Sequence, residues 1–457
     1  MASLKELCVF SRMFLSKLRT QVSGFFTLFF FTLTVLIFVI FFSTSNTSSS
    51  VATTKILASR LPSASFSSTE FDSSHTHFLP ESDTHTTSTT VLAPEDLPRK
   101  YWIYVEDTSC DIFDGGWIED NDLQPLYKPG SCPFIDDSFN CFKNGRHDTD
   151  YLRLRWKPHA CDIPRFDGLK MLKMLRGKRL VFVGDSLNRN MWQSLVCALR
   201  NSLTDKNRVK EVSGGREFRS QGFYSFKFKD FKCSIDFIKS PFLVQEWNFL
   251  DKAGARRETL LLDTIHGSLT KYHDADIIIF NTGHWWTHKK PHKVNNYFQE
   301  GNHVYNRLEV ADAYNKALKT WAHWIDTTIN SSRTRVFFRG YSASHFKGGQ
   351  WNSGGNCDGE TKPIKSDTQL APYPWMMRVL ESVISEMKTP VVYLNITKMS
   401  DYRKEGHPSI FREAKSKRRP GMFQDCSHWC LPGVPDSWNQ MLYATLLDSQ
   451  QKFFQPR

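Results

Sequence analysis

Two short motifs place a serine, an aspartate and a histidine in a pattern that suits acyl transfer. Gly184-Asp185-Ser186 directly follows an apolar run at residues 180–183, and Asp425 precedes His428 by three positions near the C-terminus. A buried strand that ends in such a turn and opens into a helix exposes a nucleophilic serine in α/β esterases. A histidine base must be held in one tautomer by a carboxylate. We therefore predict Ser186 as the nucleophile, His428 as the general base and Asp425 as its orienting partner.

Both motifs also have plain structural explanations. Gly-Asp-Ser is ordinary turn chemistry at a strand end. Asp-x-x-His occurs three times, beginning at Asp72, Asp263 and Asp425. In the third copy the histidine lies between Cys426 and Cys430, where disulfides would hold the loop rigidly. This third copy is therefore the one that we assign to catalysis.

The predicted turn also supplies candidates for stabilising an oxyanion. Gly184 in this turn is one candidate, and the backbone N–H of Ser186 would lie at a helix N-terminus, where the helix dipole favours negative charge. Asn281 follows a second buried run, and its amide could donate to a tetrahedral intermediate, although an ordinary Asn/Gly turn explains it equally well. His284, His288 and His292 have a spacing that could suggest a metal site, but Pro291 would break the helix that this requires, so we expect no metal.

The elements that must position these residues follow from apolar periodicity. Short apolar runs predict strands at 179–183, 276–280, 335–338 and 390–396, and amphipathic spacing predicts helices at 187–200, 311–329 and 372–388. Alternating strands and helices favour an α/β fold with a mainly parallel sheet covered on both faces. The reactive groups then gather at the carboxyl ends of the strands, where Ser186, Asn281 and Arg339 lie.

A run of 19 residues without a charge, 24–42, predicts a membrane anchor near the N-terminus. About 20 apolar residues span a bilayer. Four Lys or Arg residues and one Glu precede this run, and the next charge is Lys55, so the positive-inside rule keeps the tail in the cytosol. We expect a single-pass type II protein, with a cleaved signal peptide as the alternative. The expected organisation is a cytosolic tail (1–21), a transmembrane signal anchor (22–42), a disordered Ser/Thr-rich stem (43–96), a Cys-rich N-terminal segment (97–165) and a catalytic core (166–457).

Charge and cysteine content agree with a luminal enzyme. The net charge is +12, of which the cytosolic tail accounts for +3. A basic luminal protein suits an acidic partner, and a polyuronic polysaccharide is the luminal candidate, although a merely solvated surface explains the charge as well. Nucleic acid is excluded as a partner by the compartment. Nine of the ten cysteines follow the predicted anchor and none forms a Cys-x-x-Cys pair, so disulfides are expected rather than zinc. N-glycosylation sequons begin at Asn46, Asn330 and Asn395.

Seven stretches of the chain carry a family resemblance: CDIFDGGWIED (110–120), PLYKPGSCPFID (125–136), NCFKNGRHDTDYLRLRWKPHACDIPRF (140–166), VFVGDSLNRNMWQSL (181–195), NTGHWW (281–286), HFKGGQWNSGGNC (345–357) and QDCSHWCLPGVPDSWNQML (424–442). Together they resemble the plant trichome birefringence-like family of polysaccharide O-acetyltransferases. Each is weak alone and together they are specific. The segment RGYSASHF (339–346) is similar to the pectin-linked branch of the family.

The resemblance implies a three-layer α/β/α core of the SGNH/GDSL esterase type, with a disulfide-pinned N-terminal segment. It implies a Golgi membrane enzyme that acetylates a cell-wall polysaccharide such as pectin or xylan, with Ser186, Asp425 and His428 as its triad. Arg189 and Asn190 belong to the family's GDSxxRN pattern, without a role that we can assign. The disulfide pairs that it implies are Cys110–Cys161, Cys132–Cys197, Cys141–Cys430 and Cys357–Cys426.

The acetyl donor and the direction of the reaction stay open. No cofactor is expected to be bound, but the reaction requires a donor. Acetyl-CoA is neither supported nor excluded, because no phosphate-cradling glycine loop is evident. A partner protein that supplies the donor is a further candidate. The same triad could serve a polysaccharide esterase, and a non-catalytic pectin-binding bridging protein is the third interpretation.

Overall fold

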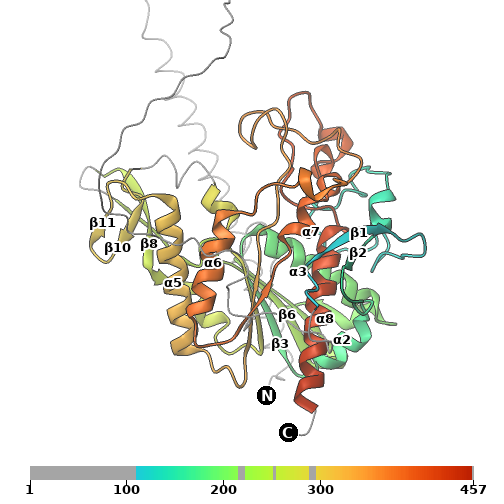
Figure 1. Cartoon of the computed structure of the whole chain (residues 1–457), viewed down its shortest axis with the longest axis horizontal. Coiled ribbons are helices and arrows are strands. Elements are labelled where there is room, and N and C mark those ends of the chain that lie inside the picture. Colours follow the sequence, from blue (N-terminus) through green and yellow to red (C-terminus); the bar gives the residue numbers. More distant parts are fainter. Residues whose placement is uncertain (1–109, 215–221, 251–253, 288–294, 455–457) are drawn as a thin grey trace, which may run out of the picture. The chain divides into compact units, whose positions relative to one another are not determined.

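The computed structural model describes residues 110–214, 222–250, 254–287 and 295–454 (Figure 1). The predicted cytosolic tail, membrane anchor and stem (1–96), with the sequon at Asn46, lie outside the described residues. In the described part of the chain no helix combines the length and the apolar character that crossing a bilayer requires.

The central sheet is mixed and has seven strands in the order β13-β12-β9-β3-β6-β5-β4. Its strands are β3 (Arg179–Gly184), β4 (Val209–Glu211), β5 (Phe223–Phe228), β6 (Cys233–Lys239), β9 (Ile277–Phe280), β12 (Arg335–Arg339) and β13 (Val391–Leu394). Neighbours from β13 to β6 pair in parallel, and β5 and β4 form an antiparallel edge. The parallel part agrees with the alternating pattern of the sequence, whereas the antiparallel edge was not predicted.

Helices cover both faces of this sheet, which gives three layers (Figure 1). Side chains alternate along each strand, so Leu180 and Phe182 of β3 enter one core and Val181 and Val183 enter the other. The first core includes residues of α2, α3 and α8, and the second includes residues of α5 and α6. The helices are α2 (Gly168–Met174), α3 (Ser186–Asn201), α5 (Val310–Thr328), α6 (Trp375–Glu386), α7 (Thr397–Asp401) and α8 (Val434–Phe454).

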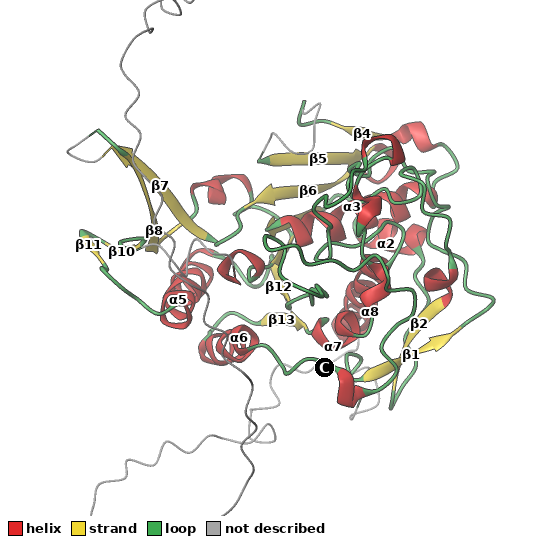
Figure 2. Cartoon of the chain, turned by 90° about the horizontal axis from the view of Figure 1, so that it is seen from above, coloured by secondary structure: helices red, strands yellow, loops and turns green. Residues whose placement is uncertain are grey.

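Two smaller sheets flank the core. One has the order β11-β10-β8-β7, formed by β7 (Val244–Leu250), β8 (Arg256–Ile265), β10 (Phe298–Glu300) and β11 (His303–Val304). The other pairs β1 (Gly115–Glu119) with β2 (Leu154–Pro158). Figure 2 shows the four-stranded sheet on the side of α5, with β1 and β2 at the opposite side of the core.

Disulfides attach the N-terminal segment and the C-terminal loop to the core. The structure pairs Cys110–Cys161, Cys132–Cys197, Cys141–Cys430 and Cys357–Cys426. These are the four pairs that the family resemblance implied. Cys233 is a free thiol, buried in β6. The loop around His428 is therefore crosslinked on both sides, through Cys426 and through Cys430.

Candidate active site

Ser186, His428 and Asp425 meet at the carboxyl end of β3. The Nε2 atom of His428 lies 2.7 Å from the Oγ atom of Ser186. Its Nδ1 atom lies 2.8 Å from one carboxylate oxygen of Asp425 and 3.1 Å from the other. The structure thus brings together the three residues that the two motifs singled out. Their hydrogen bonds run in the order nucleophile, base and orienting carboxylate.

The Asp425 carboxylate is held in its charged form. It accepts the backbone N–H groups of Ser427 at 3.2 Å and His428 at 3.0 Å. Burial alone would raise the pKa of Asp425, but the charge of His428 and these hydrogen bonds outweigh burial and hold the pKa well below its ordinary value. An ionised Asp425 requires a proton on Nδ1 of His428, which leaves Nε2 free to accept the serine proton.

The turn that carries Ser186 depends on a glycine. Gly184 has a φ of +153°, and a Cβ atom placed on it would lie 2.0 Å from the Oδ1 atom of Asn281. Asp185 follows as the N-cap of α3, because its side chain accepts the N–H of Leu187 at 2.9 Å. Ser186 is therefore the first residue of α3. The first N–H groups of a helix have no intrahelical partner, so the N–H of Ser186 can serve an oxyanion.

Asn281 fixes the same turn. Its Oδ1 atom accepts the N–H of Asp185 at 3.1 Å, and its Nδ2 atom donates to the Asp185 carboxylate at 2.7 Å. An amide carries two N–H groups, so one donor remains for a ligand. Asn281 therefore locks the nucleophile turn as well as being the predicted oxyanion donor.

Arg339 provides the positive charge beneath the site. It is buried at the end of β12, with Nη2 3.8 Å from the Asp185 carboxylate and Nε 3.4 Å from Asn188. Burial lowers its pKa to about 10, while Asp185 acts in the opposite direction, so the guanidinium stays charged at neutral pH. Arg339 thus balances the buried Asp185 and ties the ends of β3 and β12 together.

Asn190 and Arg189 hold segments that adjoin His428. Asn190 donates from Nδ2 to the backbone oxygen of Trp429 at 3.1 Å and accepts the Trp429 N–H at 2.8 Å. Arg189 lies 3.5 Å from Asp136, and its guanidinium is 5.3 Å from the centre of the Phe139 ring. That ring in turn lies 5.0 Å from the His428 imidazole. The N-terminal segment therefore packs directly against His428, the predicted base, and this particular contact was not predicted from the sequence.

Further polar side chains beside the triad were not recognised from the sequence. Ser344 donates to Ser427 at 3.1 Å and lies 3.5 Å from Nε2 of His284. The His284 ring stacks on Tyr341, with 4.5 Å between ring centres. His284 had been noted only for its spacing with two other histidines, and Ser344 only as part of the segment 339–346, so neither was predicted to lie beside the triad.

The remaining predicted features have varied positions. Tryptophan rings near the motifs would suit stacking on sugars, but Trp286, Trp429 and Trp438 are buried in the core, where sugar stacking is impossible, whereas Trp351 is exposed. Asn330 is exposed, and Asn395 is half-buried. His288 and His292 lie outside the described residues. Among the residues that the structure describes, no group of three or more His, Cys, Asp or Glu side chains could hold a metal ion.

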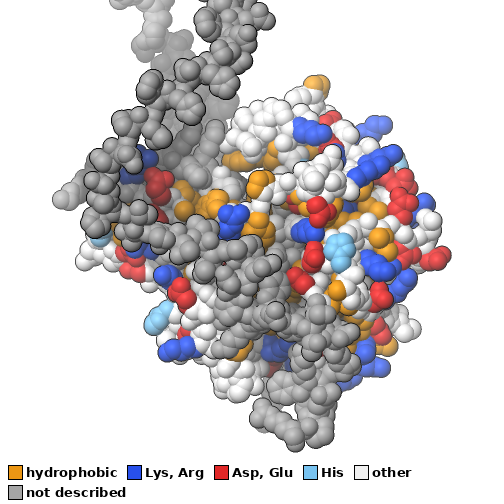
Figure 3. All heavy atoms as spheres, in the orientation of Figure 1, with side chains coloured by type: hydrophobic (Ala, Val, Ile, Leu, Met, Phe, Trp, Pro, Cys, Tyr) orange, Lys and Arg blue, Asp and Glu red, His pale blue; other side chains and the backbone are white. Residues whose placement is uncertain are grey.

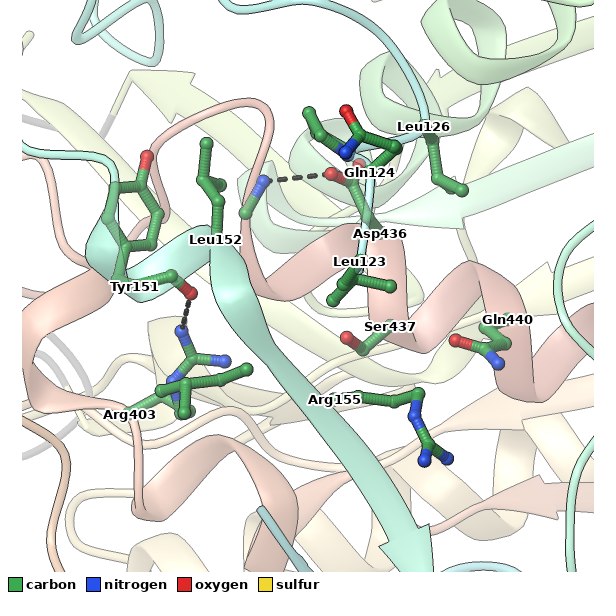
Figure 4. A pocket seen from close by; sticks show the side chains of 13 residues that line it. Leu123, Gln124, Leu126, Tyr151, Leu152, Arg155, Arg403, Asp436, Ser437 and Gln440 are labelled. Carbon is green, nitrogen blue, oxygen red and sulfur yellow. Dashed lines mark hydrogen bonds between the residues drawn. The ribbon is translucent and has the colours of Figure 1, made fainter. Parts of the chain in front are cut away.

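A pocket elsewhere in the molecule lies between the N-terminal segment and α8 (Figure 4). None of the triad residues lines it. Its Asp436 carboxylate accepts hydrogen bonds from Gly433, Ser194 and Tyr127, and its Arg403 donates to the backbone of Tyr151. The charged lining groups are thus already satisfied, as expected of a seam between two parts of one fold.

The positive net charge is not gathered into one visible patch. On the face drawn in Figure 3, the basic and acidic side chains of the described residues are interspersed. Charge alone therefore does not mark a polysaccharide path on that face.

Comparison with known sequences identifies two matching families. The pattern of a family described as a GDSL/SGNH-like acyl-esterase family found in Pmr5 and Cas1p matches residues 163–445. A second pattern, described as the PMR5 N-terminal domain, matches residues 108–162. The acyl-esterase match contains Ser186, Asp425 and His428.

Several curated proteins of Arabidopsis thaliana are similar along most of the described chain. Protein trichome birefringence-like 4 is 66% identical over 347 residues, which cover 75% of this chain and 76% of that protein. Protein trichome birefringence is 58% identical over 343 residues, covering 74% of this chain and 56% of its own length. Protein trichome birefringence-like 1 is 56% identical over 343 residues, covering 74% of this chain and 62% of its own length.

Proposed function

This chain belongs to the trichome birefringence-like family and carries an acyl-esterase-type domain, and from that premise we propose that it is a polysaccharide O-acetyltransferase. The observation that carries the proposal is the 2.7 Å contact between Nε2 of His428 and Oγ of Ser186, with Nδ1 of His428 on Asp425. The proposed acceptor is a hydroxyl group of a cell-wall polysaccharide, either pectin or a hemicellulose such as xylan.

The reaction would proceed by double displacement. Nε2 of His428 removes the Ser186 proton while Oγ attacks the acetyl carbonyl of the donor. The N–H of Ser186 and the remaining amide hydrogen of Asn281 would stabilise the oxyanion. The donor's leaving group departs with the proton from His428. A sugar hydroxyl, deprotonated in turn by His428, then attacks the acetyl-serine and releases Ser186.

The donor and the compartment form part of the same proposal. Acetyl-CoA, or a protein that delivers acetyl groups, would supply the donor from outside the described fold. The four disulfides suit an oxidising compartment. We place the enzyme in the Golgi membrane, with the catalytic domain in the lumen.

The direct test follows acetyl groups on defined polymers. Purified full-length protein would be incubated with an acetyl donor and de-esterified homogalacturonan, xylan, xyloglucan or mannan, with Ser186→Ala in parallel. We expect incorporation on one polymer class and its loss in the variant. Binding of pectin by both proteins without incorporation on any polymer would favour the bridging interpretation instead.

A second candidate is a polysaccharide esterase, because the matching family is described as an acyl-esterase family. The two reactions share the acetyl-serine and differ in whether water or a sugar hydroxyl attacks it. Acetylated polymers incubated with the protein but without donor distinguish them. Serine-dependent release of acetate as the main activity would support the esterase and contradict the transferase.

A further inference from the structure

Behind the triad, a chain of hydrogen bonds links the main chain of His428 to Asp401. Nδ1 of His407 lies 2.6 Å from the backbone oxygen of His428. Nε2 of His407 lies 2.7 Å from Nδ1 of His345. Nε2 of His345 lies 2.8 Å from the backbone oxygen of Asp401 and 3.2 Å from its carboxylate. Two imidazoles therefore connect the catalytic base to the last residue of α7.

The number of protons in this chain follows from its two ends. Both ends are backbone carbonyl oxygens, which only accept hydrogen bonds. Nδ1 of His407 and Nε2 of His345 must therefore each carry a proton, and the contact between the two rings needs a third. Two neutral imidazoles carry two protons in total. All three hydrogen bonds form together only when the pair holds one additional proton and so one positive charge.

The two rings of the pair have different surroundings. Burial, followed by the neighbouring His345, lowers the pKa of His407 well below its ordinary value. The Asp401 carboxylate adjoins His345 at the other end of the pair, while its second oxygen accepts the N–H of Ala371. His345 is thus the ring of the pair that adjoins a carboxylate, whereas His407 faces the backbone oxygen of His428.

Other charged groups also face the pair. Asp425 and His428 act on His407 from the catalytic loop, with opposite effects on its charged form. Arg146, from the N-terminal segment, donates to the backbone oxygen of His407 at 3.3 Å. Together with Asp401, these groups surround the pair from the core, the loop and the N-terminal segment.

The packing makes His407 part of the catalytic loop's support. Its ring stacks on Trp429, with 4.1 Å between ring centres. The neighbouring Gly406 accepts the N–H of Cys430 at 3.0 Å. Ser409 and Asp425 exchange backbone hydrogen bonds. The segment at 406–409 thus underlies the catalytic loop, and its one side-chain hydrogen bond to the backbone of His428 comes from His407.

We propose that His345 and His407 act as a protonated histidine pair that positions the catalytic His428. The proposal rests on the function proposed above. When the additional proton leaves at higher pH, one of the three hydrogen bonds must break, and the main chain of His428 loses part of its support. His345 and His407 are positioning residues, because neither touches Ser186. Activity should therefore fall on the alkaline side as the pair loses its proton, with the titration belonging to the pair rather than to one ring.

Variants at His345 separate its hydrogen bond from its charge. His345→Asn retains an N–H donor near the Nδ1 position and carries no titrating group, whereas His345→Leu removes both. We expect His345→Leu and His407→Leu to lower kcat about 100-fold with little change in KM, as for a misplaced base. We expect His345→Asn to recover most of that loss and to lack the alkaline decline. His323→Leu, on the exposed face of α5, is the matched control.

The test uses the full-length protein and two readouts. The first is the pH profile of serine-dependent acetyl turnover, and wild-type kcat in a folded His345→Leu would overturn the proposal. The second is nitrogen NMR of histidine-labelled Ser186→Ala protein, which needs no turnover. We expect one imidazole pair to carry three protons at neutral pH, and two neutral rings would overturn the proposal. If the protein has no activity at all, the NMR result still shows whether the His345–His407 pair carries the additional proton.

Discussion

At the scale of single residues, the proposed chemistry depends on the charge of Asp425. An ionised carboxylate keeps the proton of His428 on Nδ1, whereas an amide at the same position can stabilise the wrong tautomer. Asp425→Asn should therefore preserve the fold and lower kcat about 10⁴-fold. The measurement is turnover together with the midpoint of thermal unfolding.

A matched control is available in the second Asp-x-x-His motif. Asp263 lies in β8 and accepts the N–H of Gly301. It is not a member of the triad. Asp263→Asn should leave kcat within about twofold of wild type, as for a surface change. Equal losses in the two variants would contradict the assignment of Asp425.

The lowered pKa of Asp425 also predicts a dependence of stability on pH. A carboxyl group with a depressed pKa contributes its full stability above its unfolded pKa of about 3.9 and loses it as the pH falls toward the folded value. The wild type should exceed Asp425→Asn in unfolding free energy by about 2–4 kcal/mol at neutral pH. Denaturant unfolding from pH 7 to pH 3 should show this difference shrinking below about pH 4. A difference that grows in acid would contradict the ionised state.

The meeting of Ser186, Asp425 and His428 could be predicted from sequence because each residue belongs to a short motif. His345 and His407 could not, since neither belongs to a spacing that signals catalysis. The contact between the two histidines depends on long-range packing of the segments at 339–346 and 406–409. No local sequence pattern predicts this contact.

At the scale of elements, the junction of β3 and α3 determines where the nucleophile lies. Gly184→Ala would place a methyl group 2.0 Å from Oδ1 of Asn281 and 2.5 Å from its backbone oxygen. Asn281 directly follows β9, so β3 and β9 must shift relative to each other. We expect a loss of about 2–4 kcal/mol in unfolding free energy and a large fall in kcat.

Gly116 in β1 provides the comparison for this substitution. A Cβ atom there would meet no atom within 4 Å, so Gly116→Ala should change the unfolding free energy by less than about 1 kcal/mol. Chemical denaturation of both variants measures the difference. Equal stabilities would show that the nucleophile turn is not tightly constrained.

Parallel strands and amphipathic helices were predictable because their patterns are strong. The buried runs of β3, β9, β12 and β13 and the stripe along α5 were all located, with ends shifted by a few residues. The strand β6 was missed because its run includes the buried charge of Asp236, which Arg179 and Ser225 satisfy. The strand β7 was also missed, because its exposed sequence gives no strand signal. It is stabilised by its pairing with β8.

At the scale of the whole molecule, disulfides join the ends of the described chain around the site. The pair Cys141–Cys430 closes 289 residues and fixes the loop after His428 to the N-terminal segment. Replacing both cysteines by serine should cost about 2–5 kcal/mol of stability and lower kcat. Thermal unfolding and turnover measure the two effects.

The pair Cys110–Cys161 is the matched control, because it closes 51 residues within the N-terminal segment. Its removal should also reduce stability, with a smaller effect on kcat. If both double variants lose activity in proportion to stability alone, the C-terminal crosslink has no special role at the site.

The pairing of the cysteines could not be derived by counting them, because many pairings stay open. The predicted pairing was implied by the family resemblance. The contact of Phe139 with His428 could not be predicted either, because a disulfide-pinned segment on the core leaves open which of its side chains face the site.

The central claim is that Ser186 carries the acetyl group during transfer, and one measurement tests it most directly. The full-length protein would be mixed with donor in the absence of polysaccharide, quenched in acid and digested, and the peptide that contains Ser186 would be examined by mass spectrometry. We predict an acetyl group on Ser186 that disappears when acceptor polymer is added before quenching. Acetyl transfer to polymer without acetylation of Ser186, or full transfer by Ser186→Ala, would contradict the account.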